Sequence, residues 1–351
     1  MSASLLIYGA TGYSGRLVTH ALVALGLRPI LAGRNPAKLV AMAEQMGLAY
    51  RVAGLGEPDS LDAALRDVAV VLHTAGPFSE TYLPMLDACL RTGTHYLDIT
   101  GEVPVIEALA RRHADAVRHG IMVMPGVGFD VVPTDCLAAH VALRLPGAWR
   151  LALGVSGLAP LVTRGSARTL FEAVNQGVVR RQGLIAPAPL GSLQRRFDYG
   201  AGPRRSVNVS WGDIASAYYT TGIPDIEVYL ESTPLLEAVL ASSRYLGWMW
   251  ATGPWQAWFK ASTELIPEGP TADERAARRT VVVAEAEDRR GRRVISRLRA
   301  PEAYTVTGIA AAAVAQRVLG GDLEVGFQTP ARVYGADFVL SLPDVVREDL
   351  E

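Results

Sequence analysis

The sequence predicts an α/β protein in which an N-terminal doubly wound parallel sheet is followed by a second α+β domain with a mixed sheet. Short apolar runs alternate with helically spaced segments up to about residue 124, a glycine-rich turn follows the first run, and longer, more polar β-type segments begin after Pro125. Alternating strands and helices are typical of parallel sheets, whereas consecutive strands favour antiparallel or mixed ones. The 351 residues suffice for two domains, each with its own core.

The first part of the chain supplies the alternation. The run Ser-Leu-Leu-Ile-Tyr at 4–8 is nearly all apolar, as expected of a strand buried on both faces, and the next segment spaces Leu17, Val18, Leu22 and Leu25 along one helical face. The same reasoning predicts strands at 4–8, 28–32, 49–52, 68–73, 95–98 and 121–124, and helices at 14–26, 36–46, 59–66, 80–92 and 103–118.

The rest of the chain has a different rhythm. Strands are expected at 149–156, 204–211 and 224–231, and a hairpin at 279–287 and 293–299. An apolar helix is expected from Cys136 to Leu143, and an alanine-rich one at 303–319. Strands that follow one another in this way indicate a mixed sheet with helices on one face.

Composition excludes several classes of protein. A formal net charge of −1 gives no basic footprint for nucleic acid, and the apolar runs are shorter than the roughly 18 to 20 residues of a spanning helix. The first residues lack the basic and apolar regions of a secretory signal, so we expect a cytoplasmic protein. The two cysteines, Cys89 and Cys136, are too few for a disulfide framework and are expected in the core. No histidine pair has the spacing of a zinc site, so no metal is expected.

The glycine-rich turn carries most of the functional argument. It reads Gly9-Ala10-Thr11-Gly12-Tyr13-Ser14-Gly15, a G-x-x-G-x-x-G variant of the dinucleotide fingerprint, between the first strand and the first helix. Gly9 permits the tight turn, Gly12 the approach of a diphosphate, and Gly15 close helix–sheet packing. The helix N-terminus then favours the anion. The cofactor-binding residues expected here are Gly9, Thr11, Gly12, Tyr13, Ser14 and Gly15.

The end of the second strand predicts which dinucleotide is bound. An NAD enzyme carries an acidic residue there for the ribose hydroxyls, but this chain has Ala32-Gly33-Arg34-Asn35, with Lys38 soon after. A guanidinium matches a 2′-phosphate bidentately. The sequence therefore favours NADP(H), with Arg34, Asn35 and Lys38 at the phosphate. The alternative is that Arg34 is one of many surface arginines, since Lys38 and Lys260 are the only lysines among 34 basic residues.

Two further turns are expected at the same edge of the sheet. Ala75-Gly76-Pro77-Phe78 follows the fourth strand, and Gly101 follows the fifth. Ligands of open α/β sheets bind at the carboxyl ends of the strands, where glycine lets the backbone pass close to a cofactor. We therefore expect Ala75, Gly76, Pro77, Phe78 and Gly101 to contact the dinucleotide. The alternative for Gly76-Pro77 is an ordinary turn.

Candidate catalytic residues lie beyond the sixth strand. Asp130 and Asp135 are the leading polar candidates, and the alternative for Asp135 is capping of the helix at 136–143. Asp98 and Glu102 are secondary candidates, with Glu102 also able to begin the helix that follows. We expect His95 to be a structural residue at the end of its strand rather than a general acid.

Four tryptophans gather at Trp248, Trp250, Trp255 and Trp258. Such a cluster suits a protein core or a dimer interface, an apolar wall for an acyl substrate, or contact with a membrane surface. Few basic residues flank it, so the membrane reading ranks last.

The motifs together resemble the saccharopine dehydrogenase-like oxidoreductases, in particular the branch with mycobacterial trans-acting enoyl reductases. The resemblance rests on Gly9 to Gly15, Ala32-Gly33-Arg34, Ala75 to Phe78, Tyr96 to Glu102, Gly128-Phe129-Asp130 with Pro133 and Asp135, and Gly326-Phe327-Gln328-Thr329-Pro330. It implies an NADP-binding Rossmann domain over 1–130, a mixed-sheet substrate or dimerisation domain over 131–302, and a segment 303–351 that returns to the first domain. Short-chain dehydrogenases also open with Gly-Ala-Thr-Gly, but their Tyr-x-x-x-Lys pair is absent, because Arg34 and Gln256 precede the two lysines by four positions.

The predicted function is NADPH-dependent transfer of hydride to an activated C=C or C=N bond of a fairly apolar small molecule, such as an acyl or lipid-like substrate, by a homodimer. One alternative is saccharopine-reductase-like imine reduction of an amino-acid conjugate. A second is a non-catalytic NADP(H)-binding sensor or scaffold. No nucleic acid or transmembrane span is expected.

Overall fold

The structure, a computed structural model, describes residues 4–158, 177–234, 236–237 and 269–351. The chain divides into two compact units. Unit 1 comprises residues 1–136 and 303–342, and unit 2 comprises residues 137–302 and 343–351. The segment 303–351, expected as a whole to return to the first domain, therefore divides, because its last residues form a strand of the second sheet.

Unit 1 contains a seven-stranded sheet in the order β15-β6-β5-β4-β1-β2-β3, and every pair in it is parallel. Its strands are β1 (Leu5–Tyr8), β2 (Ile30–Gly33), β3 (Tyr50–Val52), β4 (Val70–His73), β5 (His95–Asp98), β6 (Met122–Met124) and β15 (Gly326–Phe327). The residues of β1, β4 and β6 are buried throughout, as the apolar runs predict. The strand order reverses at β1 and β4, the switch point where open α/β sheets bind ligands.

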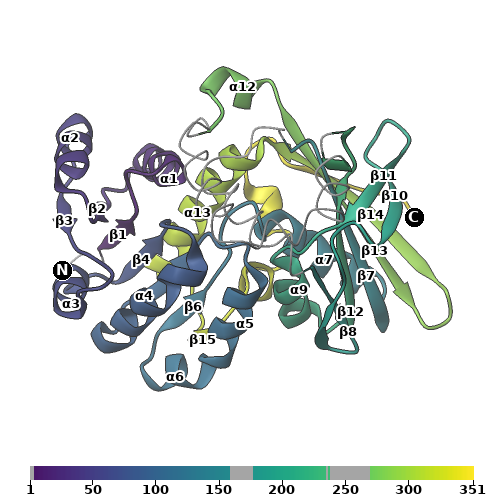
Figure 1. Cartoon of the computed structure of the whole chain (residues 1–351), viewed down its shortest axis with the longest axis horizontal. Helices are drawn as coiled ribbons and strands as arrows, with labels where there is room; N and C mark the ends of the chain where they lie inside the picture. The colour runs from purple at the N-terminus through teal and green to yellow at the C-terminus, as the bar shows by residue number, and fades with distance from the viewer. Residues whose placement is uncertain (1–3, 159–176, 235, 238–268) are drawn as a thin grey trace, which may run out of the picture. The chain divides into compact units, whose positions relative to one another are not determined.

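Helices cover both faces of this sheet, which confirms the doubly wound fold (Figure 1). They are α1 (Tyr13–Ala24), α2 (Pro36–Met46), α3 (Pro58–Leu65), α4 (Phe78–Thr92), α5 (Val103–Arg111), α6 (His113–Arg118), α13 (Ala303–Leu319) and α14 (Pro330–Tyr334). Helix α13 lies along α1 and contacts β4, while α3, α4 and α5 contact one another in sequence. Gly308 of α13 faces the backbone of Leu17 in α1.

The expected helix 103–118 is in fact two helices. Arg112 leaves helical geometry at φ −90° and ψ 11°, and its guanidinium forms ion pairs with Asp87 and Asp115. The chain therefore turns at Arg112, where periodicity alone predicts continuation. The helix expected at 136–143 begins earlier, as α7 (Val132–Arg144), so Asp135 lies inside its first turn instead of preceding it.

Unit 2 contains a nine-stranded mixed sheet in the order β10-β11-β12-β7-β13-β14-β16, with β8 paired to β12 and to β9. Among the strands that the structure describes in this sheet, β12 and β7 are parallel neighbours and the other pairs are antiparallel. The strands are β7 (Ala148–Ser156), β8 (Val178–Arg181), β9 (Leu184–Pro187), β10 (Gln194–Asp198), β11 (Pro203–Asn208), β12 (Asp225–Glu231), β13 (Arg279–Asp288), β14 (Arg293–Pro301) and β16 (Val346–Asp349), with helices α9 (Asp213–Thr221) and α12 (Ala272–Ala276). The mixed sheet of the second domain is thus confirmed.

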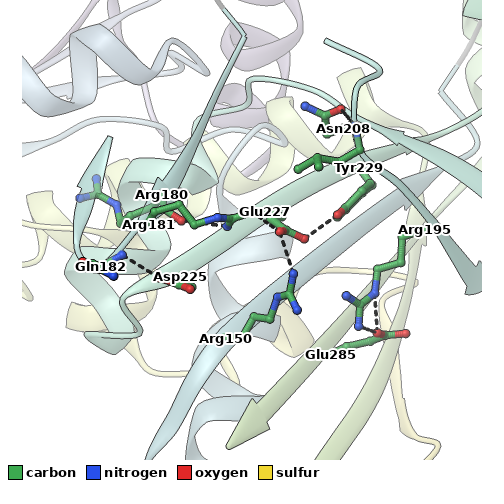
Figure 2. Close-up of polar contacts among 11 residues, drawn as sticks. Arg150, Arg180, Arg181, Gln182, Arg195, Asn208, Asp225, Glu227, Tyr229 and Glu285 are labelled. Carbon is green, nitrogen blue, oxygen red and sulfur yellow. Dashed lines mark hydrogen bonds and ion pairs between the residues drawn. The ribbon is translucent and has the colours of Figure 1, made fainter. Parts of the chain in front are cut away.

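One face of this second sheet carries buried carboxylates held by arginines. Figure 2 shows Arg150 and Tyr229 pointing to the carboxylate of Glu227. Arg181 also pairs with Glu227, which is 1% exposed. Arg195 pairs with Glu285 in the same view. The pKa of Glu227 is lowered because the hydrogen bonds from Tyr229 and Arg150 outweigh the opposing effect of burial. These contacts satisfy charges that would otherwise destabilise the sheet.

No helix among the described residues is long and apolar enough to cross a membrane. Both cysteines are buried and free of disulfides, in accord with a place in the core. The tryptophan cluster at 248–258 lies outside the described residues.

Candidate functional site

The glycine-rich turn is packed too tightly for side chains. Gly9 has φ +86°, and a Cβ there would lie 2.9 Å from the Cβ and the amide nitrogen of Ala75. A Cβ on Gly15 would lie 2.3 Å from the carbonyl oxygen of Gly9 and 2.9 Å from the Cα of Ala10. The amide of Gly12 donates to the Gly9 carbonyl at 3.0 Å. The first and third glycines are therefore needed for close approach of the backbone, as the fingerprint predicts.

The turn leads directly into the N-terminus of α1. Gly12 is the N-cap residue with extended backbone geometry and has no side chain with which to cap the helix, and the first turn of the helix has no acidic residue. The first amides of a helix need partners, and together with the helix dipole they favour an anion. Gly12 is exposed, while Thr11, Tyr13 and Ser14 are partly exposed, so this helix end is open to a ligand. The Arg16 guanidinium donates to the carbonyl of Thr11 at 2.8 Å, a hydrogen bond that helps to hold the turn.

Arg34 lies one residue beyond β2 and close to the glycine turn. The amides of Gly9 and Ala10 both donate to the carbonyl of Ala32, at 2.9 and 3.3 Å, which ties the two segments together. Arg34 is exposed, and no acidic side chain in the described ranges forms an ion pair with it. Burial raises the pKa of the Tyr8 hydroxyl, and the charge of Arg34 opposes that rise. An exposed guanidinium, without an ion pair among the described residues, thus stands at the end of β2.

The neighbouring Asn35 and Lys38 differ in what their side chains do. The Asn35 side chain accepts a hydrogen bond from the amide of Lys38 at 3.1 Å and so caps α2. Because the side-chain oxygen of Asn35 caps the helix, the expected contact of Asn35 with the phosphate would come from its backbone or its side-chain NH₂ group. Lys38 is exposed in the first turn of α2.

The turn at residues 74–78 lies directly against the glycine turn. Besides the contact between Ala75 and Gly9, the Thr74 amide and hydroxyl both donate to the carbonyl of Tyr8, at 2.8 and 2.9 Å. The hydroxyl of Thr81, in α4, donates to two carbonyls of the turn, that of Ala75 at 2.7 Å and that of Pro77 at 3.0 Å. Two of the turns predicted for the cofactor are therefore brought together at the carboxyl ends of β1 and β4.

Glu102 has a structural role that the sequence does not predict. Its carboxylate accepts hydrogen bonds from the amides of Phe78 and Ser79, each at 2.8 Å, which caps the N-terminus of α4. Its backbone begins α5, as expected. The carboxylate thus joins the turn after β4 to the turn after β5 and closes the α4 N-terminus to other anions.

Asp98 and His95 are also structural. The Asp98 carboxylate accepts from Tyr96 at 2.7 Å and from the amides of Thr100 and Gly126 at 2.9 and 3.0 Å, while burial raises its pKa to about 6. His95 accepts from the amide of Met122 at 3.0 Å, and burial lowers its pKa. Both side chains link β5 to the start or end of β6, which fits the structural reading of His95.

The two leading catalytic candidates have different surroundings. Asp130 is partly exposed and packs on Gly101, where a Cβ would lie 2.9 Å from the Asp130 Cβ and Oδ2. Removal of water from its carboxyl, together with the nearby charge of Glu102, raises the pKa of Asp130 to about 7. Asp135 is fully buried, and its carboxylate accepts from the amide of Ala331 at 2.9 Å. That contact caps α14 instead of the helix in which Asp135 lies, and it favours a structural role over contact with substrate.

His73 and Thr81 were not predicted as site residues. His73 ends β4 directly before the 74–78 turn, and its Nε2 lies 3.1 Å from the Thr81 hydroxyl. The sequence does contain a weak signal for His73, because a histidine there ends an apolar strand and precedes a glycine-containing turn.

A helix that begins directly after a tight glycine turn, with a guanidinium at the end of the next strand, is the arrangement of a Rossmann-type dinucleotide-binding domain. The comparisons agree. Residues 5–124 match the family model "Saccharopine dehydrogenase NADP binding domain". A "trans-acting enoyl reductase" of Mycobacterium ulcerans is 34% identical over 148 residues, which are 40% of this chain and 35% of that protein. One of Mycobacterium leprae is 36% identical over 139 residues, 37% of this chain and 33% of that protein.

The chain thus spans about a third of the length of these curated relatives. Among solved structures, saccharopine dehydrogenase (L-Glu forming) from Saccharomyces cerevisiae matches with a TM-score of 0.67 and 14% identity, covering 99% of this chain and 100% of that one. At this identity the likeness shows the fold. Over residues 5–124 the chain is therefore similar to the NADP-binding domain of saccharopine dehydrogenases, and the chain as a whole has the saccharopine dehydrogenase fold.

Proposed function

We propose that the chain is an NADPH-dependent oxidoreductase that transfers hydride to an activated C=C or C=N bond of a fairly apolar substrate. The observation that carries the proposal is the N-terminus of α1, which begins with a glycine N-cap and has no acidic residue in its first turn, behind the tight Gly9–Gly15 turn of a segment that matches an NADP-binding family. The amides at this helix end are oriented to hold the diphosphate.

Arg34 supports the choice of NADP(H) over NAD(H). Its exposed guanidinium follows β2, where a 2′-phosphate on the adenosine ribose would lie, and the residues from Ala32 to Asn35 include no carboxylate to hold a free hydroxyl. Lys38, in the first turn of α2, adds a second positive charge nearby. The nicotinamide half then runs along the carboxyl edge of the sheet, past Ala75–Phe78 and Gly101.

Asp130 is the proposed proton donor. NADPH, when bound, supplies a hydride to one end of the double bond, and the other end needs a proton for charge balance. A carboxyl with a pKa of about 7 is protonated in a substantial fraction of molecules at neutral pH, so it can supply that proton. Asp98 is unsuited because Tyr96 and two backbone amides already occupy its oxygens.

The names of the similar proteins favour two substrates. The trans-acting enoyl reductases, which are 34% and 36% identical over the matched residues, favour a C=C bond. The saccharopine dehydrogenase favours a C=N bond, as in an amino-acid conjugate, but it shares the fold alone. We therefore rank enoyl reduction first and imine reduction second.

The test is a titration of the protein with NADPH followed by assays of NADPH oxidation with enoyl thioesters, with imines formed from keto acids and amines, and with keto acids alone. Turnover with enoyl thioesters supports the first substrate class, and turnover only with keto acid and amine together supports imine reduction. Binding of NADPH without turnover in any assay would instead favour the sensor or scaffold. The expected homodimer and cytoplasmic location stay predictions, and light scattering of the purified protein tests the first of them.

A further inference from the structure

The turn at residues 74–78 is held from two sides by groups that do not themselves belong to it. The Thr81 hydroxyl reaches the carbonyls of Ala75 and Pro77, and the Glu102 carboxylate reaches the amides of Phe78 and Ser79. Two carbonyls of the turn and two amides at its end are therefore held by specific side chains, which fixes the direction of the peptide groups to which they belong.

The Thr81 hydroxyl has one hydrogen to donate, and three polar groups surround it: the carbonyls of Ala75 and Pro77, and Nε2 of His73. The two carbonyl oxygens, at 2.7 and 3.0 Å, are acceptors only, so the hydroxyl hydrogen is directed to them. Toward His73 Nε2, at 3.1 Å, the Thr81 oxygen must then act as the acceptor, which places the imidazole hydrogen on Nε2. The result is a chain of hydrogen bonds from His73 to Thr81 and from Thr81 to the carbonyls of the turn, which we call the relay.

The surroundings of His73 indicate that its hydrogen bond to Thr81 is the reason for a histidine at this position. The ring is fully buried among Tyr8, Phe78 and Tyr96, with ring centroids 5.6, 5.4 and 6.3 Å away. Its Nδ1 has no hydrogen-bond partner among the described residues. A buried acceptor without a partner is unfavourable, and an apolar side chain would avoid that cost. Burial lowers the pKa of His73 to about 3, so the ring is neutral at physiological pH.

The relay has a geometric consequence for Gly76. In a trans peptide, the carbonyl and the following amide point in opposite directions, and the Ala75–Gly76 peptide is trans. Because the Ala75 carbonyl is turned toward Thr81, the Gly76 amide is turned away from it. Gly76 is exposed, and within the described ranges its amide donates to no protein atom.

We propose that His73 and Thr81 are positioning residues that hold the Gly76 amide outward as a hydrogen-bond donor to the nicotinamide half of NADP(H). The acceptor has the chemistry of a ribose hydroxyl or a carboxamide oxygen, both of which lie in that half. This inference rests on the proposed course of the cofactor past residues 75–78. It assigns to Gly76 a backbone hydrogen bond to the cofactor, and to His73 and Thr81 the role of fixing the direction of the Gly76 amide.

The principal experiment is amide hydrogen exchange at Gly76 in the wild-type protein, measured by NMR with and without NADPH, beside the affinity of matched Thr81 variants. Thr81→Ser keeps the hydroxyl, and Thr81→Val keeps the shape without it. We expect NADPH to protect the Gly76 amide, Thr81→Val to weaken NADPH binding about five- to tenfold, and Thr81→Ser to restore binding to within about twofold of wild type.

A third readout does not depend on ligand or on folding of a variant. The imidazole ¹⁵N shifts of His73 in the wild-type protein report which nitrogen carries the hydrogen, and we expect Nε2. A hydrogen on Nδ1 overturns the relay. NADPH binding that leaves the Gly76 amide unprotected overturns the contact. Wild-type protein that binds no NADPH overturns the proposed function and this inference with it, which distinguishes the two failures.

Discussion

Substitution of Gly15 by alanine tests the close packing of the glycine turn. The new Cβ would lie 2.3 Å from the Gly9 carbonyl oxygen and 2.9 Å from the Cα and carbonyl oxygen of Ala10. These are backbone atoms, so no side-chain rotation can relieve the contact. To reach ordinary van der Waals distance, the Gly9 carbonyl or α1 must move by about 1 Å.

Two opposing effects set the expected change in stability. Forcing an extra methyl into a packed site costs about 1 to 3 kcal/mol, while replacing glycine by alanine inside a helix contributes about 1 kcal/mol of stability. The net expectation is a loss of about 0 to 2 kcal/mol in the free energy of unfolding. The effect on NADPH binding is larger in proportion, because the displaced carbonyl and helix end are the parts that form the diphosphate site. We expect affinity to fall at least tenfold.

Gly308→Ala is the matched control. Gly308 also lies inside a helix, but its Cβ would lie 3.4 Å or more from the nearest atoms, those of Leu17, which is ordinary contact. It therefore gains helix propensity without the clash and should be neutral or slightly stabilising, with NADPH affinity unchanged. Urea denaturation gives the stabilities of both variants, and fluorescence titration gives the affinities. Equal NADPH affinity in Gly15→Ala and wild type would refute the reasoning about the turn.

Two further substitutions test the proposed contact of Arg34 with the 2′-phosphate and the proposed proton donor, Asp130. Arg34→Asp should reduce affinity for NADPH at least tenfold more than affinity for NADH, measured by calorimetry, because a carboxylate repels the 2′-phosphate; equal losses for both cofactors would contradict the assignment. Asp130 should act in its protonated form, so wild-type turnover should fall as pH rises through about 7, and Asp130→Asn should lose most activity. The raised pKa of Asp130 also stabilises the wild-type fold at low pH, an effect fully present below the ordinary pKa near 3.8 and lost as pH rises through about 7. The difference in unfolding free energy between Asp130→Asn and wild type should therefore vary with pH over this range, and a constant difference would argue against the shift.

The elements that could be predicted from the sequence are those that local patterns determine. The apolar run at β1, the glycine turn and the spacing of α1 lie within about 25 residues, and each follows from burial periodicity and turn chemistry. Arg34 could be placed because it follows β2 directly.

The contacts that could not be predicted join segments far apart in the chain. Asp135 reads as a cap for the helix that follows it, whereas its carboxylate caps α14 through Ala331, nearly two hundred positions away. Glu102 reads as the start of α5, and only the packing of the turns after β4 and β5 shows that it caps α4. Carboxylates near helix starts are readily recognised in a sequence, but the identity of the helix they cap depends on tertiary packing.

Glu102 and Asp130 show how one packing arrangement gives two carboxyl groups different chemistry. Both lie close to the turn after β5, but the Glu102 oxygens accept two backbone amides at the start of α4, whereas the Asp130 carboxyl packs on Gly101. Amides and a helix dipole stabilise a carboxylate, while removal of water disfavours it. The charge of Glu102 then adds to the effect of burial on the pKa of Asp130. The residue that shapes the 74–78 turn therefore also tunes the proposed acid, and a side chain at position 101 would disturb that acid by displacing Asp130.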